Sequence, residues 1–302
     1  LDYLSISHSH PRWLMERWCN RYGPESTITW TAFNNKAAPI TLRVNTLKCS
    51  PARLANEFLA CDIDTRPSTW SPHALIVTRG NPRDSPLASQ GLFWLQDEAS
   101  QLIGELVTAQ PGDQILDTCA APGGKALVIA THMEDRGLLI AADVRRARTN
   151  LLSSTFKQYR IQSTRVVRLD GRSLPFPAVM RWVIVDAPCS GLGTLRRDPD
   201  IRWKRTAEDL ASFAKLQAEL LQEASRVVES GGRILYSTCS SEPEENEHVV
   251  RQFLAKNPNF TIERPANPQI APLIDEEGFF RTLSHRDGLE AFFAAQLKHQ
   301  IP

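Results

Sequence analysis

The feature that most constrains the fold is a regular alternation of short apolar runs and amphipathic stretches between residues 111 and 256. Apolar strands separated by helices form right-handed βαβ units, and such units build a parallel sheet. The sequence therefore predicts an α/β fold with a mostly parallel sheet. The expected strands are QILDTC, GLLIAADV, TRVVRLD, RWVIVDAP and GRILYSTC, and the expected helices span residues 125–133, 145–159, 206–228 and 244–256.

The segments before and after this region have patterns of their own. Beyond it, FTIER is followed by GFFRTLSH and EAFFAAQLK, which predict an antiparallel hairpin closing one sheet edge. Near the start, PITLRVNTLK alternates like a strand, Ser50-Pro51 caps the helix ARLANEFLAC, ALIVT predicts a short strand, and GLFWLQDEASQLIGELV begins another helix. We expect an aromatic-rich helical segment over residues 1–35, broken at Gly23-Pro24, a small α/β module over 36–95, and the main domain over 96–302.

Composition excludes several classes of protein. No apolar run approaches the roughly 20 residues of a membrane span, and the first residues lack the basic and apolar parts of a signal peptide. The six cysteines include no CxxC pair and the seven histidines form no cluster of ligands. We therefore expect a cytoplasmic monomer with no metal site and no membrane contact.

The basic residues are unevenly distributed, although the net charge is only +1. From Ala141 to Thr206, fourteen Lys or Arg stand against five Asp or Glu. A run of this kind is most often a solvated face, but here it surrounds a tryptophan and lies beside a cysteine, which favours contact with nucleic-acid phosphates. The candidate nucleic-acid contacts are Arg196, Arg197, Arg202, Trp203 and Lys204.

The run DTCAAPGGKA, residues 117–126, follows an expected strand and opens an expected helix. Its small residues let backbone N–H groups approach a ligand, and a helix N-terminus favours negative charge. It is not a P-loop, because Cys119 and Ala126 replace the required glycine and hydroxyl residue, and it contains no GxGxxG pattern. A nucleoside site is favoured, while a turn without a ligand stays open.

Three acidic residues end successive expected strands, namely Asp143, Asp170 and Asp186. Asp143 lies 26 residues after Asp117, close to the interval at which an acid in such folds accepts hydrogen bonds from a ribose diol. Asp170 is placed to receive an adenine amino group. Each residue alone could be a helix cap, but together they fit one nucleoside lying across the sheet.

Two cysteines also follow strand ends, Cys189 in DAPCSG and Cys239 in YSTCS. A thiolate that adds to C6 of a pyrimidine makes C5 nucleophilic, so that C5 can accept an electrophilic methyl group. The reaction also needs a hydrogen-bonding group at the base edge and a base that removes the C5 proton. Cys239, Cys189, Asp186 and Lys125 could supply this set.

DTCAAPGGK, DAPCSGLG and YSTCS with PEENE resemble motifs of the NOL1/NOP2/Sun family of RNA cytosine-5 methyltransferases. RRDPDIRW, SHPRWLMERW and LASQGLFWLQDEAS resemble its bacterial Sun/Fmu members, which methylate small-subunit ribosomal RNA. The likeness extends from about His10 to Lys298. It implies a Rossmann-like methyltransferase domain, S-adenosylmethionine as cofactor and a small-subunit ribosomal RNA precursor as partner, with residues 36–95 as an RNA-binding module.

The resemblance also implies residue roles. Cys239 would attack C6, Cys189 would help to resolve the covalent adduct, and Asp186 with Pro188 would hold the base. DNA cytosine-5 methyltransferases instead use the cysteine of a Pro-Cys pair, which here is Cys189, so the two roles need a test. The implied cofactor contacts are Cys119, Ala120, Ala121, Pro122, Gly123, Gly124, Lys125, Asp143, Arg148, Asp170, Gly171 and Asp186.

Other interpretations stay open. The same chemistry on transfer RNA is one, and a ribosome-assembly factor that binds S-adenosylmethionine without catalysis is another. A small-molecule methyltransferase would not explain two cysteines at strand ends beside a basic stretch. Bacterial Sun/Fmu proteins usually carry a NusB-like helical domain ahead of this part, and we expect residues 1–302 not to include it.

Overall fold

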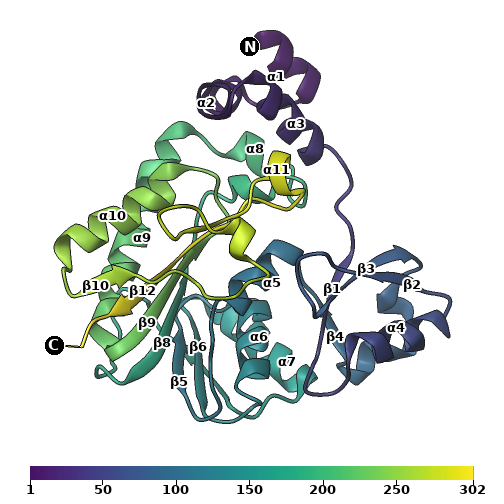
Figure 1. The fold of residues 1–302 in the computed structure, drawn as a ribbon, viewed down its shortest axis with the longest axis vertical. Helices are drawn as coiled ribbons and strands as arrows, with labels where there is room; N and C mark the ends of the chain where they lie inside the picture. The colour runs from purple at the N-terminus through teal and green to yellow at the C-terminus, as the bar shows by residue number, and fades with distance from the viewer. Residues whose placement is uncertain (302) are drawn as a thin grey trace.

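The computed structural model describes residues 1–301 and contains two β-sheets (Figure 1). The larger sheet has eight strands, with β11 paired to β12 beside the path β10-β12-β9-β8-β5-β6-β7. Strands β5 to β9 are mutually parallel, which confirms the predicted α/β class. The strands are β5 Gln114–Asp117, β6 Leu138–Asp143, β7 Thr164–Arg168, β8 Met180–Asp186, β9 Val228–Thr238, β10 Phe260–Ile262, β11 Phe280–Arg281 and β12 Phe293–His299.

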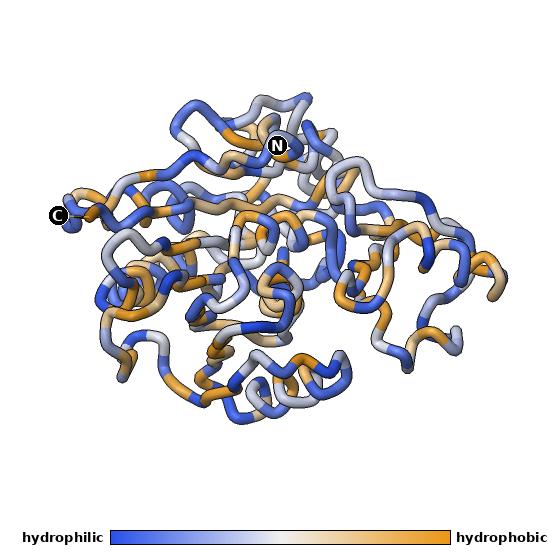
Figure 2. Tube along the Cα trace, turned by 60° about the horizontal axis from the view of Figure 1, so that its bottom comes forward, coloured by the Kyte–Doolittle hydropathy of each residue, from blue (hydrophilic) through white to orange (hydrophobic). Residues whose placement is uncertain are grey.

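Helices cover both faces of this sheet, because its strands bury side chains on both sides. Ile115 of β5 packs in a core with α5, α6 and α7, whereas its neighbour Leu116 packs in a second core with α9 and α10. Hydrophobic and hydrophilic stretches alternate along the trace (Figure 2). These helices are α5 Glu98–Glu105, α6 Gly124–His132, α7 Arg146–Tyr159, α9 Ala207–Val227 and α10 Glu247–Lys256.

The C-terminal hairpin differs from its prediction. β11 and β12 do pair antiparallel, but β12 lies inside the sheet between β9 and β10. The reason is burial: Phe293 and Ala295 enter one core while Ala294 enters the other, so β12 needs cover on both faces and a strand on each side. The strand that closes this edge is therefore β10, from the FTIER run, and the short η5 Ala271–Leu273 lies between β10 and β11.

The smaller sheet is antiparallel, with strand order β2-β3-β1-β4. Two of its strands were not predicted. β2 has the polar sequence DTRP and is half-exposed, so it lacks an apolar alternation, and β4 was assigned to the helix that follows it. Ser50 caps α4 as expected, by accepting a hydrogen bond from the Arg53 amide. The elements are β1 Thr41–Val44, α4 Pro51–Leu59, β2 Asp64–Pro67, β3 Ala74–Arg79, η1 Pro82–Asp84, η2 Pro86–Gln90 and β4 Phe93–Leu95.

Three N-terminal helices lie beside α8 and α11, far along the chain (Figure 1). Trp18 and Trp30 stack with ring centroids 4.7 Å apart and share a core with Leu192, Leu195 and Ala291. The predicted break is confirmed, since Gly23 ends one helix at φ +83° and Pro24 begins the next. None of the helices formed by residues 1–301 has the length and hydropathy to cross a membrane. The bounds are α1 Asp2–His8, α2 Arg12–Tyr22, α3 Pro24–Asn34, α8 Ile201–Lys204 and α11 Ser284–Asp287, with η3 Leu192–Thr194 and η4 Pro243–Glu245.

Candidate active site

The candidate site lies at the carboxyl ends of the central parallel strands, where folds of this type place ligands. Asp117 ends β5, Asp143 ends β6 and Asp186 ends β8. Cys189 follows β8, and Cys239 directly follows the neighbouring strand β9. The parallel pairing of these strands therefore brings together residues that lie more than a hundred positions apart in the chain.

The two cysteines are in contact, with 3.2 Å between their sulfur atoms, and both are free thiols. The hydrogen bond between them lowers the pKa of Cys239. The same bond, together with burial, raises the pKa of Cys189 well above its usual value. The lowered pKa belongs to Cys239, so we infer that Cys239 is the sulfur that loses its proton first and that Cys189 then donates to it.

Asp186 is held from two sides. Its Oδ2 accepts a hydrogen bond from Lys125 Nζ at 2.7 Å, and its Oδ1 accepts one from Ser237 Oγ at 2.8 Å. Burial disfavours the charged form of Lys125, but the neighbouring Asp186 carboxylate outweighs burial and raises the pKa of Lys125. The Lys125 ammonium also lies 5.4 Å from the ring centroid of Phe292. The result is an oriented ion pair beside the thiols.

Sequence reasoning missed Ser237 and Phe292. Ser237 could have been found, because the two-residue period of a strand places it on the same side as Cys239. Phe292 lies more than fifty residues beyond Cys239, and no local pattern connects it to Lys125.

A cavity of about 260 Å³ opens between the ends of β5, β6 and β7, and Pro188, the residue before Cys189, lines it. Asp143 accepts a hydrogen bond from the Arg145 amide at 3.0 Å and faces Arg148 at 3.4 Å. Five residues predicted to bind the cofactor thus share one cavity. The lining residues are Thr118, Cys119, Asp143, Val144, Arg148, Asp170, Gly171, Arg172, Pro188, Leu216 and Leu220.

Asp170 stands at this cavity with its carboxylate already engaged. Arg172 donates to both carboxylate oxygens, at 2.7 Å and 3.0 Å, and these bonds lower the pKa of Asp170. Asp170 therefore stays charged at the cavity wall. A ligand amino group would share this carboxylate with Arg172.

The loop of residues 118–123 leads from β5 into α6. Gly123 has φ +109°, a left-handed conformation that favours glycine, and it provides no side-chain cap for the helix. Burial, followed by the charge of Asp117, raises the pKa of Cys119 to about 12, so this sulfur stays a thiol. Ala120 donates its amide to Ala142 O at 2.9 Å, and Pro122 O accepts from Thr155 Oγ1 at 3.2 Å. The loop is thereby fixed against β6 and α7.

Asp117 is a further residue that the sequence did not single out as a ligand. Its Oδ2 is buried without a hydrogen-bond partner. Burial, followed by the charge of Asp186, raises the pKa of Asp117 to about 7. A buried acceptor with no partner costs free energy unless a ligand or water satisfies it.

The predicted nucleic-acid contacts do not form one exposed surface. Arg202 is only 3% exposed and donates to Ser9 O at 3.0 Å and to Asn35 Oδ1 at 2.8 Å, so its assignment as a contact is wrong in this structure. Arg202 links two of the N-terminal helices, because Ser9 lies at the end of α1 and Asn35 lies at the end of α3.

The neighbouring residues divide into paired and exposed ones. Arg196 is mostly buried, paired with Glu290 at 2.9 Å and placed over the Phe33 ring. Arg197 is partly exposed and pairs with Asp97 at 2.6 Å. Trp203 is 62% exposed and Lys204 lies beside it on the surface. These two are the predicted contacts whose side chains are open to a partner.

Comparison with known proteins matches this geometry to one family. The description "16S rRNA methyltransferase RsmB/F" applies to residues 105–298, and "Methyltr_RsmF/B-like, ferredoxin-like domain" to residues 10–83. The chain belongs to the RsmB/F family. This membership confirms the resemblance to bacterial Sun/Fmu proteins.

Similar proteins cover nearly the whole chain. The probable ribosomal RNA small subunit methyltransferase B of Synechocystis sp. is 33% identical over 98% of this chain and 68% of its own length. The protein of that name from Bacillus subtilis is 28% identical over 98% of this chain and 67% of its own. The crystal structure of PH0851 has a TM-score of 0.91 at 32% identity, over 98% of this chain and 67% of that one. The structure of NSun6 from Pyrococcus horikoshii with SFG shares the fold, with a TM-score of 0.86 at 21% identity, over 97% of this chain and 99% of that one.

RsmB/F proteins are RNA methyltransferases, and this chain is one that uses S-adenosylmethionine. The site fits that cofactor. Asp143 lines the cavity and offers a carboxylate for a ribose diol. Asp117 precedes the lining residues Thr118 and Cys119, and its buried, unpartnered Oδ2 is an acceptor that an ammonium group would satisfy. The uncapped N-terminus of α6, at Gly123 and Gly124, suits a carboxylate.

Proposed function

We propose that the protein methylates C5 of a cytosine in small-subunit ribosomal RNA through a covalent bond between Cys239 and C6 of the base. The observation that carries the proposal is the hydrogen bond from Cys189 to Cys239, which lowers the pKa of Cys239. A second support is the name of the relatives, which are ribosomal RNA small subunit methyltransferases.

The proposed reaction begins when the Cys239 thiolate adds to C6, which makes C5 nucleophilic. Asp186, oriented by Lys125 and Ser237, accepts a hydrogen bond from the amino group at the cytosine edge. S-Adenosylmethionine, when bound, supplies an electrophilic methyl group. A base then removes the C5 proton, the bond between C6 and sulfur breaks, and the Cys239 thiolate is restored.

Cys189 is placed to act in the last part of this sequence. It donates to the sulfur of Cys239 before the attack. Once that sulfur is bound to C6, the hydrogen bond that most raises the pKa of Cys189 is lost, so Cys189 can release its proton to solvent and accept the one from C5 as a thiolate. Its raised pKa means that it holds its proton through the attack. We therefore assign attack to Cys239 and resolution of the adduct to Cys189.

The RNA must present an unpaired cytosine. A base inside a helix cannot reach the partly buried thiol of Cys239, and unstacking costs a few kcal/mol, least in a loop or bulge. We assign RNA contact to the module of residues 36–95 and to exposed Trp203, on which a base can stack. Trp203→Ala should weaken RNA binding about fivefold or more, since base stacking contributes about 1–3 kcal/mol. Tyr3→Ala is the control, because Tyr3 is 79% exposed and lies outside the basic stretch.

The test is incubation with methyl-labelled S-adenosylmethionine and ribosomal RNA that lacks cytosine-5 methylation. Wild type should label C5 of cytosine, Cys239→Ala should not, and Cys189→Ala should accumulate a protein–RNA adduct that survives a denaturing gel. Cys61→Ala, a partly buried cysteine of the small module, is the control and should behave as wild type.

Other outcomes would contradict the proposal in different ways. Adduct accumulation in Cys239→Ala would exchange the two roles. Labelling of transfer RNA alone would show that the substrate is transfer RNA rather than ribosomal RNA. Tight binding of S-adenosylmethionine with no transfer to any RNA would favour a ribosome-assembly factor.

A further inference from the structure

The loop that follows the nucleophile contains a fully buried carboxylate. We call residues 239–247 the Cys239 loop; it includes η4 and Glu245, whose exposure is 0%. Glu245 Oε1 accepts hydrogen bonds from the Ser190 amide at 2.8 Å and from Gln217 Nε2 at 3.0 Å. Its Oε2 accepts from the hydroxyls of Ser190 and Ser240. One side chain thus joins the residue after Cys189 to the residue after Cys239.

We propose that Glu245 is a positioning residue that sets the contact between Cys189 and Cys239 by holding both of their loops. This inference rests on the proposed function, in which that contact activates Cys239. It adds a residue that touches neither RNA nor cofactor and acts on the reaction through the two cysteines.

The chemistry of the contacts requires a carboxylate at this position. Four donors converge on two oxygens, and only an ionised carboxylate has acceptors for all of them. Glutamine could keep its oxygen toward the Ser190 amide and Gln217, but its NH2 group would then face two hydroxyls that donate to Glu245, and both would have to turn and become acceptors. Within residues 1–301 no Lys or Arg forms an ion pair with Glu245, so its charge is supported by hydrogen bonds alone. A buried charge is costly, so it is retained here for placement rather than for stability.

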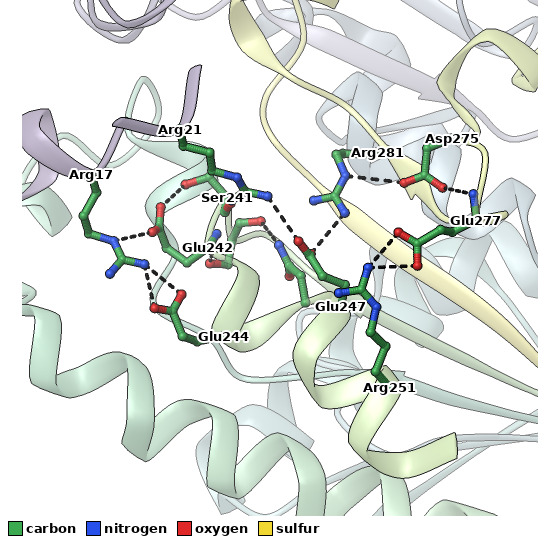
Figure 3. Close-up of polar contacts among 12 residues, drawn as sticks. Arg17, Arg21, Ser241, Glu242, Glu244, Glu247, Arg251, Asp275, Glu277 and Arg281 are labelled. Carbon is green, nitrogen blue, oxygen red and sulfur yellow. Dashed lines mark hydrogen bonds and ion pairs between the residues drawn. The ribbon is translucent and has the colours of Figure 1, made fainter. Parts of the chain in front are cut away.

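The Cys239 loop is also braced from its outer side, by α2 (Figure 3). Arg17 and Trp18 donate to the two oxygens of Glu242, at 2.8 Å and 3.1 Å. Arg21 donates to Ser241 O at 2.6 Å. The inner side is held by Glu245 and by Asn246, which donates to Ser240 O at 2.9 Å. Glu245 is the one of these two that also holds the residue after Cys189.

Glu245 has a second effect on the cysteines, which runs in the opposite direction. Its negative charge alone raises the pKa of both Cys189 and Cys239. The other charged groups facing Cys239 are Lys125, which lowers its pKa, and Asp186, which raises it. Loss of the charge would therefore lower the pKa of Cys239, whereas loss of the Cys189 contact would raise it. The direction in which the pKa of Cys239 changes therefore shows whether Glu245 acts mainly by positioning the two cysteines or through its charge.

The test is the pH dependence of Cys239 alkylation by iodoacetamide, read by mass spectrometry of the Cys239 peptide, on the full chain without RNA. Glu245→Gln should raise the pKa of Cys239 and slow its alkylation at pH 7 about tenfold, the change that follows from one pKa unit. Glu244→Gln is the matched control, because Glu244 is the adjacent residue and its carboxylate pairs with Arg17 near the surface. It should leave the alkylation profile unchanged.

Two further variants define how Glu245 acts. Cys189→Ala should itself raise the pKa of Cys239, and adding Glu245→Gln to it should produce no further rise. Ser190→Ala removes one donor and leaves Glu245 charged, so it should give a smaller shift of the same sign even if Glu245→Gln folds poorly.

A lowered or unchanged pKa of Cys239 in folded Glu245→Gln would overturn the inference. So would an additional rise when the variant is combined with Cys189→Ala. These results would leave the proposed function standing, provided that wild-type Cys239 has a lowered pKa. An ordinary pKa of Cys239 in wild type would instead remove the main support of the proposed function itself.

Discussion

Arg202 should stabilise the fold rather than bind RNA, and Arg202→Met tests this. The guanidinium is 3% exposed and donates to Ser9 O, Asn35 Oδ1 and Pro199 O at 2.8–3.1 Å. Burial lowers its pKa, and no carboxylate among residues 1–301 pairs with it. Methionine keeps the unbranched stem and the helix propensity but donates no hydrogen bond.

The magnitude follows from the bonds that are lost. A hydrogen bond that involves a charged group contributes about 1.5–3 kcal/mol, and the two bonds to the N-terminal helices would leave buried acceptors without partners. The relief of a buried charge offsets part of this loss. We therefore expect Arg202→Met to lower the free energy of unfolding by about 3 kcal/mol.

Urea denaturation followed by circular dichroism measures this change, with RNA binding measured on the folded variant. Lys204→Met is the matched control. Lys204 and Asp200 form an exposed ion pair at 3.7 Å, and such pairs contribute little, so the variant should change the free energy of unfolding by less than about 0.5 kcal/mol. The reasoning would be refuted if Arg202→Met changed stability by less than about 1 kcal/mol and weakened RNA binding instead.

Two further predictions concern the site itself. Asp117 has a pKa of about 7 in the folded protein, above its value in an unfolded chain, so its contribution to stability is present at low pH and is lost as the pH rises through that value. As the pH rises from 4 to 8, the free energy of unfolding of Asp117→Asn should therefore increase by as much as about 4 kcal/mol relative to that of wild type. Urea denaturation across that pH range measures this difference, and an identical pH dependence in both proteins would contradict the raised pKa of Asp117. Gly193→Ala should lower stability by about 2 kcal/mol and abolish methyl transfer, because a Cβ there would lie 1.9 Å from Ala291 O and 2.8 Å from Cys239 O; normal thermal unfolding and activity would show that this backbone contact is not needed.

The strands that carry the site could be predicted from the sequence because parallel strands buried on both faces are continuous apolar runs. The positions of Asp143, Asp186, Cys189 and Cys239 followed from that pattern, since each residue stands at or just after the end of a run. Strand β2 could not be predicted, because DTRP gains its structure from pairing with β3 rather than from its own apolar pattern.

Residues whose roles depend on distant partners were beyond sequence reasoning. Arg202 belongs to a basic run, and only the packing of α8 against the N-terminal helices shows that it is buried. Likewise, PEENE contains three glutamates, and nothing in the letters distinguishes buried Glu245 from surface Glu244. The contacts that decide these cases join residues about 50 to 200 positions apart.

The packing of the N-terminal helices determines the order in which parts of the protein can fold. These helices leave the ribosome before the two sheets, yet Trp18 and Trp30 pack beside Ala291, which is made about 260 residues after Trp30. Domains generally fold as their chain emerges, but this segment cannot complete its core until the residues around Ala291 have been synthesised. Docking of α2 on the Cys239 loop is therefore a late event, so a nascent chain that has only the smaller sheet and strands β5 to β9 would still lack a fixed nucleophile.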